Sequence, residues 1–128
     1  RKELTDEWEN RGVKKGEEFA ILTDEITKTW SGFTTREYKN YKGLQKEGLR
    51  DHMTNMELVL NMLAEASTTE ISKDKAPETF DENKKVARQG GNVAKAARKQ
   101  LEDTTKKNVV TSKNAKTLKN KNNNSLNK

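Results

Sequence analysis

The 128-residue sequence contains no cysteine, a single histidine and a single proline. The absence of cysteine excludes a disulfide framework, a thiolate metal site and a cysteine nucleophile. Because His52 is the one imidazole, a histidine-rich metal site is excluded as well. No apolar run approaches the roughly 18 residues that a bilayer-spanning helix needs. The N-terminus has neither an initiator methionine nor the apolar core of a signal peptide. We therefore expect a soluble, cytoplasmic piece of a longer product, without a membrane partner.

Positive charge is concentrated at the C-terminal end of the chain. The net charge is +6, and seven lysines but no acidic residue follow Asp103, which leaves residues 1–103 at about −1. Residues 111–128 are rich in lysine and asparagine, and such a stretch buries too little apolar surface to offset the entropy of ordering it. We predict a helical interaction domain over residues 1–103 and a basic, mostly disordered tail over residues 104–128.

The spacing of apolar residues, glycines and the proline predicts an all-α fold of about five helices, because no alternating run is long enough for a sheet. The predicted helices cover residues 5–12, 14–30, 34–43, 54–75 and 79–102. The run 58–66 is apolar nearly all the way round, and a helix without a polar face is usually central to its domain. We therefore expect the helices to pack around a central apolar helix near residues 55–74, with Leu60 and Leu63 buried.

Three threonines carry the sequence pattern of a helix start. In a capping box, the threonine hydroxyl and a glutamate three residues later each satisfy an unpaired backbone N–H. The pattern occurs at Thr34 with Glu37, Thr54 with Glu57, and Thr79 with Glu82. We expect a helix to begin at each of these threonines.

Small residues lie on one face of the last predicted helix. Gly90, Gly91 and Ala94 share this face, and the apolar phase is the same before and after the glycines. The shared phase favours one long helix, although each interior glycine costs about 1 kcal/mol relative to alanine and a kink at 90–91 is the alternative. Small side chains at these positions predict the close approach of another helix.

Few residues qualify as catalytic or metal-binding candidates. His52 follows Asp51 directly, and such a pair can form a general base. Asp24 and Glu25 are adjacent carboxylates that could hold magnesium, although such residues more often line a solvated helix face. Neither pattern is accompanied by the further groups that a reaction needs. We therefore predict no enzyme, no catalytic residue, no metal and no cofactor.

Two groups of cations are candidates for binding nucleic acid or a partner. Arg36, Lys39 and Lys42 alternate with two tyrosines, a composition that single-strand binders use for phosphate contacts and base stacking. We favour the alternative that the tyrosines pack inward and the cations are solvated. The second group shares one side of the last predicted helix, where an ordinary solvated face is the alternative. It consists of Lys84, Arg88, Lys95 and Lys99.

Seven ordered stretches resemble the DNA-damage-inducible protein D (DinD) family. They are residues 18–26, 29–32, 38–44, 49–58, 65–71, 90–94 and 97–99. The resemblance covers about residues 3–112 and leaves the asparagine-rich tail outside. In that family these motifs form the C-terminal half, which follows a domain similar to viral and phage BRO-type DNA-binding modules. The resemblance implies modulation of recombinase filaments on DNA rather than catalysis.

Three functional hypotheses follow. The first is a module that binds a RecA-type recombinase or its filament in the DNA-damage response. The second is a direct DNA-binding or antirepressor-type module that uses the cations between residues 84 and 99. The third and most distant is a magnesium-dependent nuclease that uses Asp24, Glu25 or Asp51.

Overall fold

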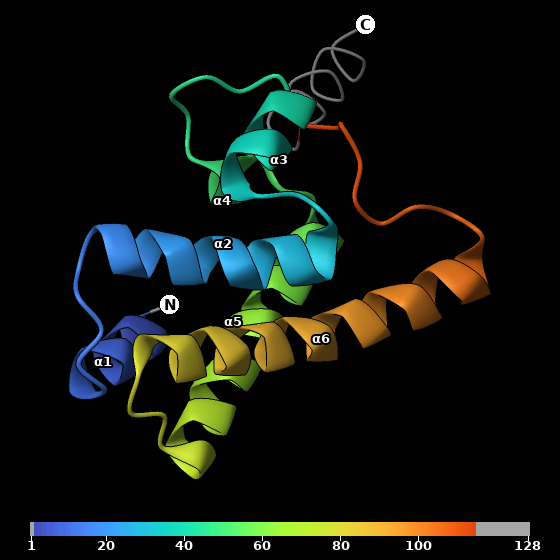
Figure 1. Ribbon diagram of the computed structural model, residues 1–128. Helices are drawn as coiled ribbons and strands as arrows, with labels where there is room; N and C mark the ends of the chain where they lie inside the picture. Colours follow the sequence, from blue (N-terminus) through green and yellow to red (C-terminus); the bar gives the residue numbers. More distant parts are fainter. Residues whose placement is uncertain (1, 115–128) are drawn as a thin grey trace, which may run out of the picture.

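The computed structural model describes residues 2–114, and this part of the chain contains six α-helices and no strand (Figure 1). The helices are α1 (Lys2–Asn10), α2 (Glu17–Ser31), α3 (Thr35–Tyr41), α4 (Leu49–His52), α5 (Asn55–Lys75) and α6 (Phe80–Thr105). The all-α prediction is confirmed. The additional helix is α4, a single turn that is too short for a periodic apolar pattern to reveal. Among the described residues, no helix has the length and apolar character that crossing a bilayer requires.

Reciprocal threonine caps begin two helices at the predicted positions. At α3, the Thr34 hydroxyl accepts a hydrogen bond from Glu37 N–H at 3.2 Å, and the Glu37 carboxylate accepts Thr34 N–H at 2.9 Å. These hydrogen bonds hold the pKa of Glu37 below its ordinary value. At α5, Thr54 and Glu57 form the same reciprocal pair. Both predicted capping boxes are confirmed.

The start of α6 differs from the prediction in one detail. The Thr79 hydroxyl accepts Glu82 N–H at 3.1 Å, as predicted, but the Glu82 carboxylate accepts the N–H of Glu78 at 2.7 Å. The reciprocal half of the cap is therefore displaced by one residue, because the carboxylate reaches beyond Thr79 to the preceding backbone N–H. From this cap α6 continues through Gly90 and Gly91 as one helix, which settles the choice between a continuous and a broken helix.

The helices form two layers. In Figure 1, α2 and α6 lie side by side while α5 crosses behind them, and α5 and α6 form the most extensive helix contact. Helix α1 packs against α5, and the short helices α3 and α4 lie beside one end of α2. The core between them contains Trp8 of α1, Trp30 of α2, Leu60 of α5 and Ala87 of α6.

Gly90 and Gly91 bring α6 against two helices at once. A Cβ atom at Gly90 would lie 2.7 Å from the Thr68 Cα atom of α5. A Cβ atom at Gly91 would lie 3.1 Å from the Ile26 carbonyl oxygen of α2. Threonine side-chain atoms, of Thr68 and Thr29, lie closer still, but the backbone atoms cannot turn aside as a flexible side chain would. The predicted close helix approach is confirmed, and glycine is the residue that permits it.

The substitution Gly90→Ala is expected to lower the free energy of unfolding by about 1–3 kcal/mol, because the new methyl group overlaps the Thr68 backbone. The intrinsic helix preference for alanine acts in the opposite direction by about 1 kcal/mol. Urea denaturation followed by circular dichroism measures the net effect. Asn92→Ala, on the exposed side of the same helix, is the control and should be neutral or slightly stabilising. A stabilising Gly90→Ala would contradict the close contact.

Helix α5 is central on one side only. Leu60 is 3% exposed and Ala64 is fully buried, as expected for the central helix. On the opposite side, however, Leu63 is 36% exposed and Val59 is 55% exposed. The prediction that Leu63 is buried is therefore wrong. An apolar run predicts burial of the whole helix, but the surrounding helices cover only the side that faces α1, α2 and α6.

Leu60→Ala is expected to lower the free energy of unfolding by about 2–5 kcal/mol, because it leaves a cavity in the core. Leu63→Ala, three residues along the same helix, is the matched control and should change it by about 0.5 kcal/mol or less. Denaturant titration of both variants at a protein concentration low enough to keep the chain monomeric provides the comparison. Equal losses would mean that the exposed side of α5 is covered in the monomer.

After α6 the chain turns back toward α3 (orange in Figure 1). Lys106 ends the helix with a left-handed φ of 60°, and Val110 is 6% exposed within the core. The Val109 N–H donates to a Glu102 carboxylate oxygen at 2.9 Å. Partial burial raises the pKa of Glu102, but the hydrogen bonds from Val109 and Arg98 outweigh it, so this pKa lies below its ordinary value.

This return segment shows how the C-terminal end of the described chain is organised. The boundary predicted at residue 103 falls inside α6, which ends at Thr105, and Val110 of the predicted tail lies in the core. The two valines and the hydrogen bond to Glu102 help to anchor a segment whose composition is otherwise polar. The disorder predicted for residues 115–128 lies outside the described residues.

Candidate interaction surfaces

The four cations predicted to share one side of α6 fall into two pairs. Arg88 Nε lies 3.1 Å from Glu25 Oε2 of α2, and Lys84 Nζ lies 4.0 Å from Glu25 Oε1. Lys95 and Lys99 are exposed on the C-terminal half of the helix, where neither forms an ion pair with another described residue. A single carboxylate of α2 thus partly neutralises half of the predicted group.

The cations predicted on α3 also separate. Arg36 is exposed and Lys39 is partly exposed, and both line a hollow of about 510 Å³ between α2 and α3. Lys42, by contrast, is buried. Tyr38 is fully buried, whereas Tyr41 is 44% exposed, so inward packing holds for one tyrosine of the two. The alternating arrangement in the sequence therefore does not form one continuous stacking surface.

The buried Lys42 belongs to a network around the carboxylate of Glu57. Its Nζ atom lies 2.7 Å from Glu57 Oε1, and both side chains are completely buried. The Tyr38 hydroxyl donates to the other carboxylate oxygen of Glu57. Lys42 Nζ also donates to the carbonyl oxygens of Thr111, at 2.9 Å, and Lys113. The network joins α3, the start of α5 and the return segment.

The network removes Lys42 from the candidate binding residues. Burial, the hydrogen bond to Glu57 and the negative charge of that carboxylate raise the pKa of Tyr38 far above its ordinary value. The phenol therefore stays protonated and donates to the carboxylate. The Lys42 ammonium donates hydrogen bonds to this carboxylate and to two carbonyl oxygens, so it is turned away from solvent. The prediction of a surface lysine is wrong, because Glu57 supplies a buried partner from another helix.

Glu57→Gln is expected to lower the free energy of unfolding by about 3–5 kcal/mol, because it leaves the buried Lys42 ammonium without its counter-charge. Glutamine is also accepted in a capping box, so the helix start is preserved. Adding Lys42→Met removes the stranded charge and should recover part of the loss. Denaturant titration of the single and double variants measures both effects. A double variant less stable than Glu57→Gln alone would contradict this account.

The predicted catalytic candidates point in different directions. The Asp24 carboxylate accepts a backbone N–H at the start of α3 at 3.0 Å, whereas Glu25 faces the cations of α6. His52 Nδ1 lies 2.8 Å from the Asn114 side-chain oxygen, and Asp51 is exposed. Within residues 2–114, no three histidine or carboxylate side chains gather as metal ligands would. Asp24 and Glu25, the pair that the nuclease hypothesis uses, therefore face different helices and not one site.

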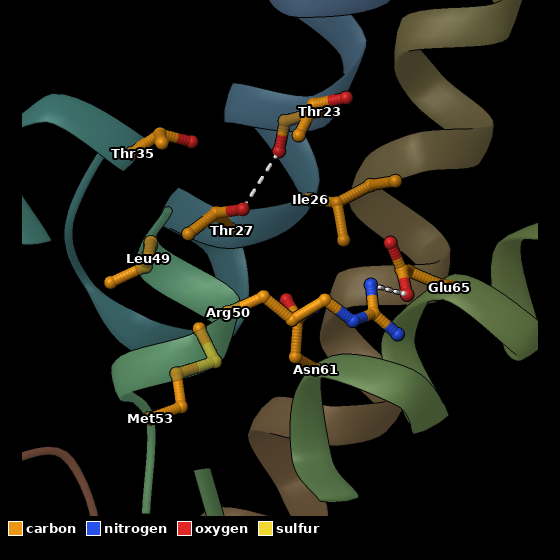
Figure 2. A pocket seen from close by; sticks show the side chains of 9 residues that line it. All are labelled: Thr23, Ile26, Thr27, Thr35, Leu49, Arg50, Met53, Asn61 and Glu65. Atoms are coloured by element: carbon orange, nitrogen blue, oxygen red, sulfur yellow. Dashed lines mark hydrogen bonds and ion pairs between the residues drawn. The ribbon is translucent and has the colours of Figure 1, made fainter. Parts of the chain in front are cut away.

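A pocket of about 240 Å³ opens between α2, α4 and α5 (Figure 2). Arg50 reaches across it from α4, and its Nη1 atom lies 2.8 Å from Glu65 Oε1 on α5. Asn61 accepts the indole N–H of Trp30 at 3.2 Å, and the Thr27 hydroxyl donates to a carbonyl oxygen of its own helix. Each of these polar groups has a partner within the protein, and the Arg50–Glu65 ion pair links α4 to α5.

The second exposed feature is an apolar stripe on α5. We call it the α5 apolar face; it consists of Met56, Val59, Met62, Leu63 and Ala66. The four larger residues are 42%, 55%, 51% and 36% exposed, in that order. Sequence reasoning assigned this run to the core. The sequence signal that could have revealed this exposed face is that α5 is apolar on two opposite sides. Neighbouring helices that pack on one side leave the other side exposed.

These features define an all-α domain with a buried ionic network around Glu57 and, on its surface, a cationic helix and an apolar helix face. The chain matches the model of the DinD C-terminal domain over residues 1–120 and therefore belongs to that family, which is related to DNA damage. The resemblance in the sequence motifs is confirmed, and the match extends past its limit at residue 112. No curated protein and no solved structure matches the chain.

Proposed function

We propose that this chain is a non-catalytic module of the DNA-damage response that binds a RecA-type recombinase or its filament on DNA. Membership of the DinD C-terminal domain family supports a role in the response to DNA damage. The observation that carries the choice of partner is the pairing of Glu25 with Lys84 and Arg88. This pairing partly neutralises two of the four predicted α6 cations, which weakens phosphate binding there and favours a protein surface as the partner.

The remaining charge supports the same choice. Binding through the DNA backbone draws its affinity from the number of phosphates that a protein neutralises. Three of the seven predicted cations are engaged inside the protein or with Glu25. The candidates that remain are Arg36, Lys39, Lys95 and Lys99. Residues 1–103 also carry a net charge of about −1, so they attract a polyanion weakly.

The second candidate is a direct DNA-binding or antirepressor-type module. Lys95 and Lys99 favour it, because they are exposed one helical turn apart on α6. Such a pair contacts adjacent phosphates without reading sequence. The lysines after Asp103 add attraction of the same kind.

The variant Lys95→Glu/Lys99→Glu separates the two candidates. We expect its co-sedimentation with a recombinase filament on single-stranded DNA to equal that of the wild-type chain, because the partner is a protein surface. The control is Lys75→Glu/Lys85→Glu, which makes the same change in net charge at two exposed lysines elsewhere. Circular dichroism establishes that both variants keep their helices.

Direct DNA binding predicts a different pattern. The Lys95→Glu/Lys99→Glu variant would then lose retention of bare DNA, and the slope of log affinity against log salt would fall by about 2 for the two lost contacts. The control variant would keep both. A wild-type chain that binds bare DNA strongly but neither the free recombinase nor its filament would overturn the proposed function.

A further inference from the structure

The α5 apolar face is the largest exposed apolar feature that the described side chains form on one helix. Its members follow one another at intervals of three or four residues, so they form one stripe along the helix. From Met56 to Ala66 the stripe extends about 15 Å. Contiguous apolar patches on soluble domains mark places where another surface binds. The same helix buries its opposite side in the core, so the stripe is held rigidly in place.

The stripe is complementary to itself when two copies run antiparallel. In such a pair, residues at equal distances before and after the position of the two-fold axis lie opposite one another. Met56 then meets Ala66, and Val59 meets Leu63, while Met62 lies next to the two-fold axis and flanks the Val59–Leu63 pairs. The long side chain of Met56 at one end therefore faces the small side chain of Ala66 at the other.

The charges at the two ends of the stripe are opposite. Glu70 and Asp74 continue it beyond Ala66 at the same four-residue spacing, and with the exposed Lys73 between them this end carries a net charge of −1. At the other end, Lys107 and Lys113 line a hollow together with Met56. An antiparallel pair places the acidic end of each copy against the basic end of the other. A parallel pair would place like charges together.

We infer that the α5 apolar face binds the same face of a second copy of this chain, and that the two α5 helices run antiparallel about a two-fold axis. The interface is isologous, so each residue contact occurs twice. Its centre is apolar and its ends are charged, which is the usual arrangement of a protein interface. The inference rests on α5 and on the charges at its ends, and is independent of any recombinase.

The first test is sedimentation velocity of residues 1–128 over a concentration series, without DNA or recombinase. The wild-type chain should show a reversible monomer–dimer equilibrium. Val59→Glu/Met62→Glu should raise the dissociation constant at least about 30-fold, because it buries charge at the centre of the interface. Val93→Glu, at an exposed valine of α6, is the matched control and should leave the dissociation constant unchanged. Circular dichroism checks that each variant keeps its helices.

The second test determines the direction of the helices. Glu70→Lys/Asp74→Lys and Lys107→Glu/Lys113→Glu should each weaken the homodimer, because each places like charges at both contacts. Mixing the two variants should restore dimers, and so should all four substitutions in one chain. A parallel dimer predicts instead that each variant alone dimerises as well as the wild type, and that result would overturn the antiparallel arrangement.

Two other results would overturn the inference as a whole. One is a chain that stays monomeric throughout the concentration series; the proposed function would still stand, because it is measured by filament association. The other is a monomeric chain whose Val59→Glu/Met62→Glu variant loses filament association, which would identify the recombinase as the occupant of the face. Dimers that persist in this variant would place the interface elsewhere and contradict the assignment.

Discussion

The buried carboxylate of Glu57 is the interaction on which the end of the domain around α3 depends. It lies in the first turn of α5 and binds the ammonium of Lys42 and the hydroxyl of Tyr38, both from α3. Lys42 in turn holds the carbonyl oxygen of Thr111, after α6. A buried charge without partners would be costly, and here α3 supplies both partners of Glu57, while the segment after α6 supplies carbonyl acceptors for Lys42. The position of α3, with its remaining surface cations, follows from this network.

Close helix packing determines the charge that the opposite end of the domain presents. Gly90 and Gly91 let α6 approach α5 and α2 until backbone atoms are nearly in contact. At this separation Glu25 of α2 reaches the cations in the first half of α6. The same packing that stabilises the core therefore reduces the positive charge of the surface. Two small residues with no functional groups thereby influence the charge of the surface.

The proposed partner and the inferred dimer fit together physically. A recombinase filament repeats the same protein surface along its length, and a dimer presents two copies of its own binding surface. Two linked contacts on one filament bind more tightly than a single contact, because the second forms at high effective concentration. A weak individual contact would then suffice, which suits a domain whose residues 1–103 carry little net charge. Such a module would distinguish the filament from the free recombinase.

The sequence by itself determined the helical class, the threonine N-caps and the family, because helix periodicity and capping depend on residues only three or four apart. It favoured a continuous last helix but left a kink at Gly90 and Gly91 as the alternative, and the structure decided between them. The sequence did not determine which residues are covered. Leu63 belongs to an apolar run but is exposed, and Lys42 belongs to a charged stretch but is buried. The single turn α4 and the anchoring of Val110 also escaped prediction. Only the tertiary structure decided these points, because burial and ion pairing depend on neighbours that the fold brings from distant parts of the chain.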